Sequence, residues 1–557
     1  MTKKKFLAIL NVQSAIACLI TGIVLTIQFG FKLSSQNEAF FYKLITYLAI
    51  YFIIDIFLRI FIRGPRHLLT HISDLAIFVL FINRFVPLPF SNLVIIQIAM
   101  LIIMLGRIVH IHQLFKNLKF KPAQMLIIGF LFCIFIGSIL LSLPIATYKS
   151  AIPYPDAVFT ATSAICVTGL VVNNISKTFT IFGLATIMLL MQIGGLGIMA
   201  LSVVLARILN RKMSHSETLE FQQTYSTMST SESWQALKAI FKFTFLFEAV
   251  GAGLLFFFWK NDFSSNLYAL FASVFHSISA FCNAGFSLFS NSFVDYATNY
   301  SIVSVIAFLI IIGGIGFPVI VDLTNRLKNR KIKTPIRLHT KIVLTATFLL
   351  LLSGTILILI GEYNGSLAPY SSLGKKSFVA FFQSVTARTA GFNTINLESF
   401  KLPTLFFLII LMYIGASPGS TGGGIKTSTA SVLFLNAWNT LRSQDKTEIS
   451  GRTISRENTR KALAIIILSA VLIAFFFYLL LSFEKHSFVK VLFETFSAFG
   501  TVGLSLGITK YLSFAGKMII IVVMFIGRVG PLTLAYALAR RKPKINYAYP
   551  KENILIA

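Results

Sequence analysis

Four short apolar segments, each about half the length of a membrane-spanning helix, constrain this chain more than any other feature of its sequence. Each is followed by a turn that contains glycine, and then by a long apolar run. They recur at intervals of roughly 110 residues, which indicates that one structural unit has been duplicated. The four segments are 157–165, 271–280, 378–387 and 491–499. The predicted unit is a spanning helix, a half-length helix that re-enters the membrane, and a second spanning helix.

The composition of the whole chain requires a membrane. Of its 557 residues, 56% are hydrophobic and 12% are charged, and the mean hydropathy is +0.81. A soluble protein of this size could not bury so much apolar surface. Apolar runs of about 20 residues, the length that crosses a bilayer, occur for example at 6–27, 125–143, 237–259, 342–360 and 462–481. The lipid bilayer is therefore the first predicted partner.

The formal net charge of +30 would also suit a nucleic-acid-binding protein, but its distribution along the chain does not. Basic residues gather between every second pair of predicted spans, which is the positive-inside pattern of membrane proteins. The basic stretches are Lys3–Lys5, Arg63–Arg66, Lys116–Lys121, Arg207–Lys212, Arg326–Lys341, Arg442–Lys461 and Arg540–Lys544. This pattern predicts that both termini are cytoplasmic, and we expect no nucleic acid as a partner.

No feature of the sequence predicts an enzyme. The four cysteines lack the paired spacing of a metal site or a disulfide framework. Residues 419–427 nearly spell a phosphate-binding loop, but Ile425 intrudes before Lys426 and no predicted strand precedes the segment. Since no catalytic cluster is apparent either, we expect no catalytic residues.

The glycine-containing turns that follow the short segments suit an ion filter. A cation that loses its water shell needs a ring of backbone carbonyl oxygens in its place. Glycine suits such a ring because it adopts backbone angles that a Cβ atom forbids. We therefore predict one selectivity filter, to which each unit contributes one turn. Its residues are Val167, Thr168, Gly169, Asn283, Ala284, Gly285, Thr389, Ala390, Gly391, Thr501, Val502 and Gly503.

The half-length helices are expected to support the pore. Each would direct its C-terminal end, with roughly half a negative charge, toward the cavity below the filter. Asp156 suits the N-cap position of the first half-length helix, or it attracts cations. Glu494 lies inside the fourth, where an acid needs a partner or water, so it either supports the pore or forms a buried salt bridge.

The second helix of each unit carries a cluster of glycines. The clusters are Gly194–Gly197, Gly313–Gly316, Gly422–Ile425 and Gly527–Pro531. Glycine at matching depths lets helices approach closely or bend, and beside a pore it leaves room for an ion. Ordinary helix packing explains any one cluster, whereas recurrence in all four favours a shared geometric role.

The four turns, together with the segment Ser417–Thr427, resemble the Trk/Ktr/HKT superfamily of potassium transporters, nearest its bacterial TrkH/KtrB-like branch. The resemblance covers residues 122–541. It implies an all-α polytopic membrane protein in which four units surround one pore with pseudo-fourfold symmetry. Because glycine occupies all four filter positions, it implies K⁺ as the substrate, bound only at the filter carbonyls. Na⁺ would be a coupling or activating ion, and no covalently bound cofactor is expected.

The same resemblance implies a gate below the filter. A flexible loop would interrupt the second helix of the third unit, and its residues are Gly419, Ser420, Thr421, Gly422, Gly423, Gly424 and Lys426. Pro418 and the many small residues support this independently, because they cannot sustain a regular helix. By resemblance, Arg528 would form a positive barrier that contacts the loop. The alternative is that Arg528 only pairs with an acid or with carbonyl groups.

The chain divides into three predicted domains. The conducting core is 122–541, with unit 1 at 122–210, unit 2 at 237–325, unit 3 at 341–435 and unit 4 at 460–541. Residues 1–121 would form an accessory transmembrane domain, with helices at 6–28, 39–62, 72–88 and 92–113, and 542–557 a cytoplasmic tail. Polar and basic residues recur every third position from Arg107 to Lys119, which resembles a degenerate voltage sensor. The alternative for the accessory domain is a lipid-facing or assembly scaffold.

The leading functional prediction is potassium uptake across a bacterial plasma membrane. By resemblance, the chain would form a homodimer with one pore in each copy. It would rest on a cytoplasmic nucleotide-binding ring of the TrkA/KtrA kind, for which the basic loops 326–341 and 442–461 are candidate docking surfaces. The alternative is a voltage-responsive, weakly selective monovalent cation channel.

Overall fold

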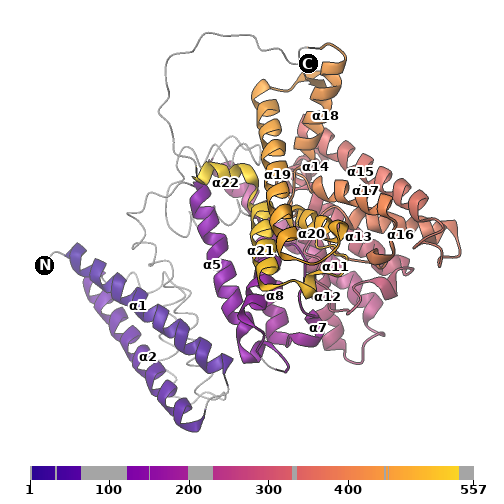
Figure 1. The fold of residues 1–557 in the computed structure, drawn as a ribbon. Coiled ribbons are helices and arrows are strands. Elements are labelled where there is room, and N and C mark those ends of the chain that lie inside the picture. Colours follow the sequence, from indigo (N-terminus) through magenta and orange to yellow (C-terminus); the bar gives the residue numbers. More distant parts are fainter. Residues whose placement is uncertain are drawn as a thin grey trace, which may run out of the picture.

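The computed structural model describes residues 3–31, 34–63, 122–149, 151–197, 230–328, 335–444, 447–449 and 451–538. Within these ranges the regular structure is helical except for one small hairpin, in which β1 (Glu448–Ile449) pairs antiparallel with β2 (Arg452–Thr453). Figure 1 shows the helices of the four predicted units packed into one bundle. The all-helical prediction is therefore confirmed for the described core.

Each unit contains a long helix, a short helix and a second apolar helix, in that order. In unit 1 these are α5 (Pro122–Ser142), α6 (Tyr154–Ile165) and α8 (Ile181–Leu196), and in unit 2 they are α11 (Thr230–Trp259), α12 (Asn266–Phe281) and α13 (Tyr300–Ile315). In unit 3 they are α15 (Leu338–Glu362), α16 (Leu373–Thr386) and α17 (Leu402–Tyr413), and in unit 4 they are α19 (Arg456–Phe483), α20 (Phe488–Gly500) and α21 (Phe514–Val529). Short helical turns in the connections are α7 (Ile175–Thr178), η2 (Pro144–Ala146), η3 (Val294–Tyr296), η4 (Leu397–Ser399) and η5 (Thr509–Tyr511).

The short helices are too short to cross a bilayer, as predicted. They have 12, 16, 14 and 13 residues, and at about 1.5 Å per residue none spans a core of roughly 30 Å. Each begins a few residues before its predicted segment. In α16 the added first turn contains Lys375 and Lys376, and the Ser372 side chain caps it by accepting from the Lys375 N–H. Because this first turn is polar, it does not belong to the apolar run that indicates the rest of the helix.

The second spans of units 2 and 4 are sharply bent. The axis turns by 96° between α13 and α14 (Phe317–Lys328), and by 91° between α21 and α22 (Pro531–Leu538). The bends fall at Gly316 and Gly530, whose φ angles of 97° and 87° are incompatible with a right-handed helix. In unit 3 the break is longer, because α17 ends at Tyr413 and α18 (Thr427–Leu441) does not begin until Thr427. The second helix is therefore interrupted in unit 3, where the sequence predicts a loop, and bent in units 2 and 4, where the glycine clusters suit either close packing or bending.

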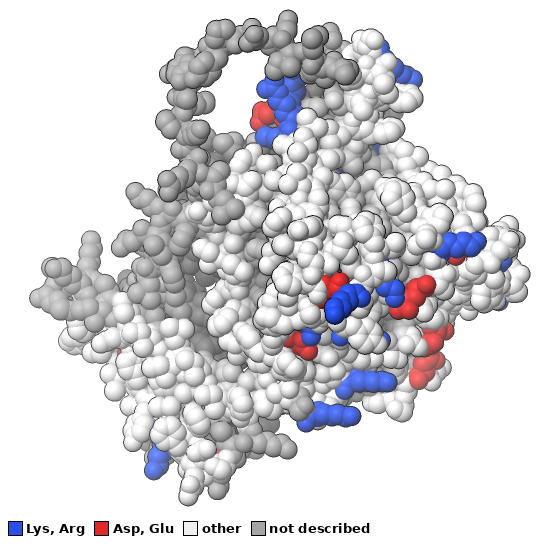
Figure 2. Space-filling model, in the orientation of Figure 1, with Lys and Arg blue, Asp and Glu red and all other residues white. Residues whose placement is uncertain are grey.

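The outer surface of the bundle suits lipid. By length and composition, four of the described helices can cross a membrane, or six if each bent pair counts as one span. Large apolar side chains such as Phe348, Phe406 and Tyr478 are exposed on the outside of the bundle. Figure 2 shows a broad band of surface without charged side chains, between charges near the outer ends of α18 and α19 and charges on the opposite side of the band. A multi-pass membrane protein explains this distribution.

The accessory domain is described only in its first half. Helices α1 (Lys3–Gly30) and α2 (Ser35–Arg63) match the first two predicted spans and pack together around Cys18, Leu25 and Phe52 (Figure 1). The predicted spans 72–88 and 92–113 lie outside the described residues, as do the basic series from Arg107 and the tail 542–557.

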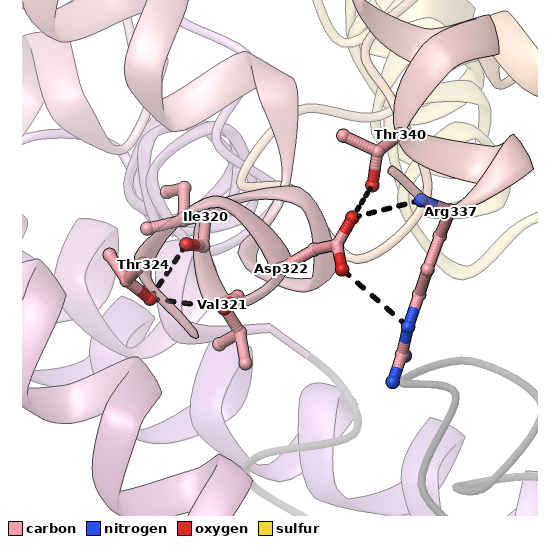
Figure 3. Close-up of polar contacts among 6 residues, drawn as sticks. All are labelled: Ile320, Val321, Asp322, Thr324, Arg337 and Thr340. Carbon is pink, nitrogen blue, oxygen red and sulfur yellow. Dashed lines mark hydrogen bonds and ion pairs between the residues drawn. The ribbon is translucent and has the colours of Figure 1, made fainter. Parts of the chain in front are cut away.

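A carboxylate joins the bent end of unit 2 to the start of unit 3 (Figure 3). Asp322 on α14 accepts hydrogen bonds from the Thr340 hydroxyl at 2.7 Å and from the Arg337 backbone N–H at 3.3 Å. The Arg337 guanidinium lies 3.6 Å away, and its side chain is 59% exposed. Asp322 thus supplies an acceptor to the first turn of α15, where backbone N–H groups lack helical partners.

We predict that Asp322→Ala lowers the free energy of unfolding by about 1–3 kcal/mol, because it leaves a buried hydroxyl and a backbone N–H unpaired. Arg337→Ala should cost less than about 1 kcal/mol, because its exposed ion pair is weak and the backbone bond remains. Thermal unfolding of both variants in one detergent tests the ranking. Equal losses in the two variants would contradict it.

Candidate ion filter and gate

The four predicted filter glycines meet in a closed cycle. A Cβ atom added to each glycine would lie 3.1 to 3.3 Å from the Cα atom of the next one in chain order, and the fourth would return to the first. The successive pairs are Gly169 with Gly285, Gly285 with Gly391, Gly391 with Gly503, and Gly503 with Gly169. Residues that are far apart in sequence therefore surround one point.

Backbone oxygens occupy the space beside each glycine. A Cβ atom on Gly169 would lie 2.6 Å from the Ala284 carbonyl oxygen, which precedes the next glycine. The same clash recurs at Gly285 with the Ala390 oxygen (2.7 Å), at Gly391 with the Val502 oxygen (2.6 Å), and at Gly503 with the Thr168 oxygen. Real Cβ atoms do not approach backbone oxygen so closely, so only glycine fits these positions without movement of the ring.

The turns also hold an unusual backbone conformation that the sequence did not indicate. The residue two positions before each filter glycine has a positive φ, and three of these four residues are β-branched. The angles are 57° at Val167, 58° at Asn283, 73° at Thr389 and 50° at Thr501. Positive φ in a β-branched residue is rare and costs of order 1–3 kcal/mol, so the surrounding structure must impose it.

Buried serines on the short helices anchor three of the turns. The Ser163 hydroxyl accepts from the Gly169 N–H at 3.1 Å, and the Ser497 hydroxyl accepts from the Gly503 N–H at the same distance. The Ser279 hydroxyl donates to the Phe286 carbonyl at 2.8 Å. Each serine lies six positions before its filter glycine, so a recurring serine was an available signal that the sequence analysis missed.

Glycines of the second helices pack against the ends of the short helices. A Cβ atom on Gly194 would lie 2.9 Å from the carbonyl carbon of Ile165, the last residue of α6. Gly527 packs in the same way on Phe499, near the end of α20. Close helix packing, one of the two interpretations of these clusters, therefore describes Gly194 and Gly527.

The predicted gating loop folds back on itself between α17 and α18. The Gly415 N–H donates to the Ile425 carbonyl at 2.9 Å, and the Ala416 N–H donates to the Gly423 carbonyl at 3.3 Å. The Lys426 ammonium donates to the Gly422 carbonyl at 2.7 Å. The loop therefore has a defined backbone conformation in this structure.

The loop touches unit 2 and a filter turn. Its Ser417 and Thr421 N–H groups donate to the carbonyls of Gly314 and Gly313 at 3.0 and 3.2 Å. The Gly423 N–H donates to the hydroxyl of Thr501, a filter-turn residue of unit 4, at 3.1 Å. The structure thus brings the predicted loop directly against the predicted filter.

Arg528 connects the loop to unit 1. Its side chain is only 8% exposed, and its guanidinium donates to the carbonyl of Thr421 in the loop and to the carbonyl of Gly194 at the end of α8. Both partners are backbone carbonyls rather than an acid. The structure therefore places Arg528 against the gating loop, between units 1, 3 and 4.

The sequence predicts two pore-supporting acids, Asp156 and Glu494, and Asp156 does not occupy the N-cap position that suits it in sequence. Asp156 is in the first turn of α6, whose N-cap is Pro153, so the N-cap prediction is wrong. Its carboxylate instead binds the Lys517 ammonium of α21 at 2.6 Å, a stronger partner than a backbone N–H. Glu494 is fully buried and accepts from the hydroxyls of Ser505 and Thr509, so its partners are not basic. The salt-bridge alternative for Glu494 is therefore wrong.

Comparison with known proteins decides the family. The family model for TrkH, described as a cation transport protein, matches residues 121–547. The chain belongs to the TrkH cation transport family. A similar relative is the Ktr system potassium uptake protein B of Vibrio alginolyticus, 42% identical over 78% of this chain and 94% of the relative. The potassium/sodium uptake protein NtpJ of Enterococcus hirae is 35% identical over 79% of this chain and 98% of the relative.

The fold of this TrkH-family chain also resembles a solved structure. The crystal structure of the potassium transporter TrkH from Vibrio parahaemolyticus matches with a TM-score of 0.61, over 84% of this chain and 96% of that chain. The sequences are only 20% identical in this comparison, so the likeness shows the fold alone. Membership in a family of transport proteins agrees with the prediction that this chain is not an enzyme.

We predict that Gly503→Ala destabilises this TrkH-family protein by roughly 1–3 kcal/mol, because the added methyl group meets the Thr168 oxygen and the φ of 90° disfavours any side chain. Gly253→Ala is the matched control, since among the described residues no atom outside the adjoining turns of its own helix lies within 4 Å of the added methyl group, and the change favours helix. Thermal unfolding in detergent compares them. A Gly503→Ala protein as stable as Gly253→Ala would show that the ring is looser than described.

Proposed function

We propose that this chain conducts K⁺ into the cell through a filter formed by Gly169, Gly285, Gly391, Gly503 and the carbonyl groups beside them. The closed cycle of the four glycines is the observation that carries the proposal. A ring of backbone oxygens can replace the water shell of a cation, and no side chain with a formal charge is needed. Two relatives are named potassium uptake proteins, which supports K⁺ as the ion.

The four units surround the filter with pseudo-fourfold symmetry in this proposal. Support comes from the order of contacts, because each glycine meets the glycine of the next unit along the chain. The C-terminal ends of the short helices would then lie near one axis, where their partial negative charges stabilise a cation. The conducting core is 122–541, and residues 1–121 form an accessory membrane domain.

The loop 419–426 is the proposed gate, and Arg528 is its latch, the residue that holds the loop in its closed position by a hydrogen bond. The loop lies against Thr501 of the filter turn, and the Arg528 guanidinium holds the Thr421 carbonyl. Lys426 and Arg528 also place two positive charges beneath the filter, which disfavours the passage of a cation. Opening requires the loop to leave these contacts.

Partners and ion dependence follow by analogy with the relatives. Ktr proteins are named as parts of a system, and NtpJ is named as a potassium/sodium uptake protein. The name of NtpJ suggests Na⁺ as a coupling or activating ion. By resemblance to the family we include a homodimer in a bacterial plasma membrane and a cytoplasmic nucleotide-binding ring, and from the distribution of basic residues we include cytoplasmic termini. The voltage-responsive channel is not proposed, because Arg107 and the series after it lie outside the described residues and no observation favours it.

Growth tests the proposed function. A bacterium that lacks potassium uptake, when supplied with this chain and its regulatory partner, should grow at low K⁺. Gly169→Ser should reduce that growth, because a side chain at this position meets the Ala284 oxygen. Gly253→Ala, produced at the same level, should grow like wild type. Failure of the wild-type protein would refute potassium uptake, and full growth of Gly169→Ser would refute the filter.

A second test addresses the gate. Arg528→Gln should raise passive K⁺ flux into vesicles several-fold, because the loss of one charge-assisted contact is worth about 1.5–3 kcal/mol to the closed loop. Arg528→Lys keeps the charge but not the planar fork that holds two carbonyl groups, so its flux should lie between those of Arg528→Gln and wild type. Flux at or below the wild-type value in folded Arg528→Gln would rule out a latch.

A further inference from the structure

The units differ in how the chain beyond the filter is attached to its own short helix. In units 2 and 4, the residue nine positions before the filter glycine is polar and fully buried: His276 before Gly285 and Glu494 before Gly503. Each reaches the serine two positions after that glycine, Ser287 or Ser505. We call this contact, between the residue nine positions before the filter glycine and the serine two positions after it, a brace.

The brace in unit 2 has a defined proton arrangement. The Leu288 backbone N–H donates to Nε2 of His276 at 3.2 Å, and the Ser287 hydroxyl lies 3.2 Å from the same nitrogen. Because Nε2 must accept from the amide, the ring proton is on Nδ1, which lies 2.8 Å from the Ala272 carbonyl oxygen. The imidazole also stacks on Phe289 at 4.8 Å between ring centroids, so both hydrogen bonding and packing fix its position.

The brace in unit 4 uses a carboxylate. Glu494 accepts from the Ser505 hydroxyl at 2.7 Å, and its other oxygen accepts from the Thr509 hydroxyl. The Ser505 and Thr509 hydroxyl oxygens lie 2.9 Å apart, so both hydroxyls face the same carboxylate. Hydrogen bonds to a buried acid are stronger than those between neutral groups and are costly to leave unmade.

Units 1 and 3 lack this pair of residues, although in unit 1 the Asn173 side chain, beyond the filter glycine, donates to Asp156 in the first turn of its own short helix at 3.5 Å. In unit 1 the equivalent Thr160 donates to the Asp156 carbonyl within its own helix, and Val171 replaces the serine. In unit 3 the equivalent residue is Phe382. The backbone of Asn393 there is bonded to the loop of unit 2 instead, through Ser292 and Phe293.

Unit 3 has polar side chains both on its short helix and beyond its filter glycine, but these side chains are not hydrogen-bonded to each other. Both side-chain polar atoms of Gln383, the side-chain amide oxygen of Asn393 and the Thr394 hydroxyl are buried and make no hydrogen bond within the described part of the chain. Polar groups are thus present on the short helix and beyond the glycine, but the brace is not formed. In the described part of unit 3, the chain beyond the filter glycine is therefore tied to unit 2 rather than to its own short helix.

From these contacts we propose that His276 and Glu494 are positioning residues that hold two opposite corners of the filter and thereby set its preference for K⁺ over Na⁺. Units 2 and 4 are opposite because the glycines meet in chain order. A ring that is fixed at opposite corners resists contraction around the smaller Na⁺, whereas a loosened ring can adapt to it. The inference rests on the proposed filter.

The test measures ion affinity, so that it does not depend on opening of the gate. Titration calorimetry of the full-length protein in detergent gives the dissociation constants for K⁺ and for Na⁺. His276→Phe keeps the aromatic packing and removes both ring nitrogens, and Glu494→Met keeps a similar volume without the acceptors. Each should lower the ratio of K⁺ to Na⁺ affinity by about tenfold, the effect of losing roughly one buried hydrogen bond.

Conservative variants and a matched control separate positioning from general damage. His276→Gln and Glu494→Gln each keep an acceptor and should recover much of the ratio. Thr160→Val removes a hydroxyl at the equivalent position of unit 1, where no brace exists, and should leave the ratio unchanged. Loss of discrimination in Thr160→Val equal to that in His276→Phe would overturn the proposal.

The remaining outcomes are also decisive. If His276→Phe and Glu494→Met are folded and discriminate like wild type while Gly169→Ser does not, the brace is wrong and the filter survives. If Gly169→Ser also discriminates like wild type, the proposed filter itself fails. If either His276→Phe or Glu494→Met does not fold, the double variant Ser505→Ala/Thr509→Val removes both hydroxyls from which Glu494 accepts, and an unchanged ratio in that variant refutes the proposal.

Discussion

Backbone groups at membrane depth must be hydrogen-bonded by protein or water, because lipid offers them no partner. Helices that end halfway across the bundle, as α6, α12, α16 and α20 do, place their last carbonyls and the following turns under this constraint. The structure meets it by packing helix glycines tightly on those ends and by aiming serine hydroxyls at the turns. The close approach of the units, and with it the ring of filter glycines, is a consequence.

The broken second helices obey the same rule. Where α13 stops at Gly316, its final carbonyls on Gly313 and Gly314 have no helical donor, and the N–H groups of Thr421 and Ser417 supply one. At the end of α8, the Gly194 carbonyl accepts from both the Gly197 N–H and the Arg528 guanidinium. The loop that is proposed to gate the pore is therefore also a cap for neighbouring helix ends. Moving it would leave those carbonyls unpaired until water reached them, which couples opening to hydration of the pore.

Sequence reasoning located the short helices, the four glycines that meet and the loop between α17 and α18, because each depends on a local rule: helix length, freedom of backbone angles, or the inability of glycine and proline to continue a helix. It did not find the positive φ of Val167, Thr389 and Thr501, because β-branched residues disfavour that conformation and only contacts between units impose it. It misplaced Asp156 for a similar reason, since the residue's ion-pair partner, Lys517, lies in another unit. The bends at Gly316 and Gly530 were ambiguous, because the same glycines also suit close packing.

Two electrostatic contributions of opposite sign meet below the proposed filter. The C-terminal ends of four short helices favour a cation there, whereas Lys426 and Arg528 disfavour one. Both basic side chains are bound to backbone carbonyls of the loop, on Gly422 and Thr421, so their positions change only if the loop itself changes. A gate of this kind would act by charge as well as by size. Displacing the loop would remove the steric obstacle and carry one positive charge with it, and the attraction of the helix ends would then act on the ion with less opposition.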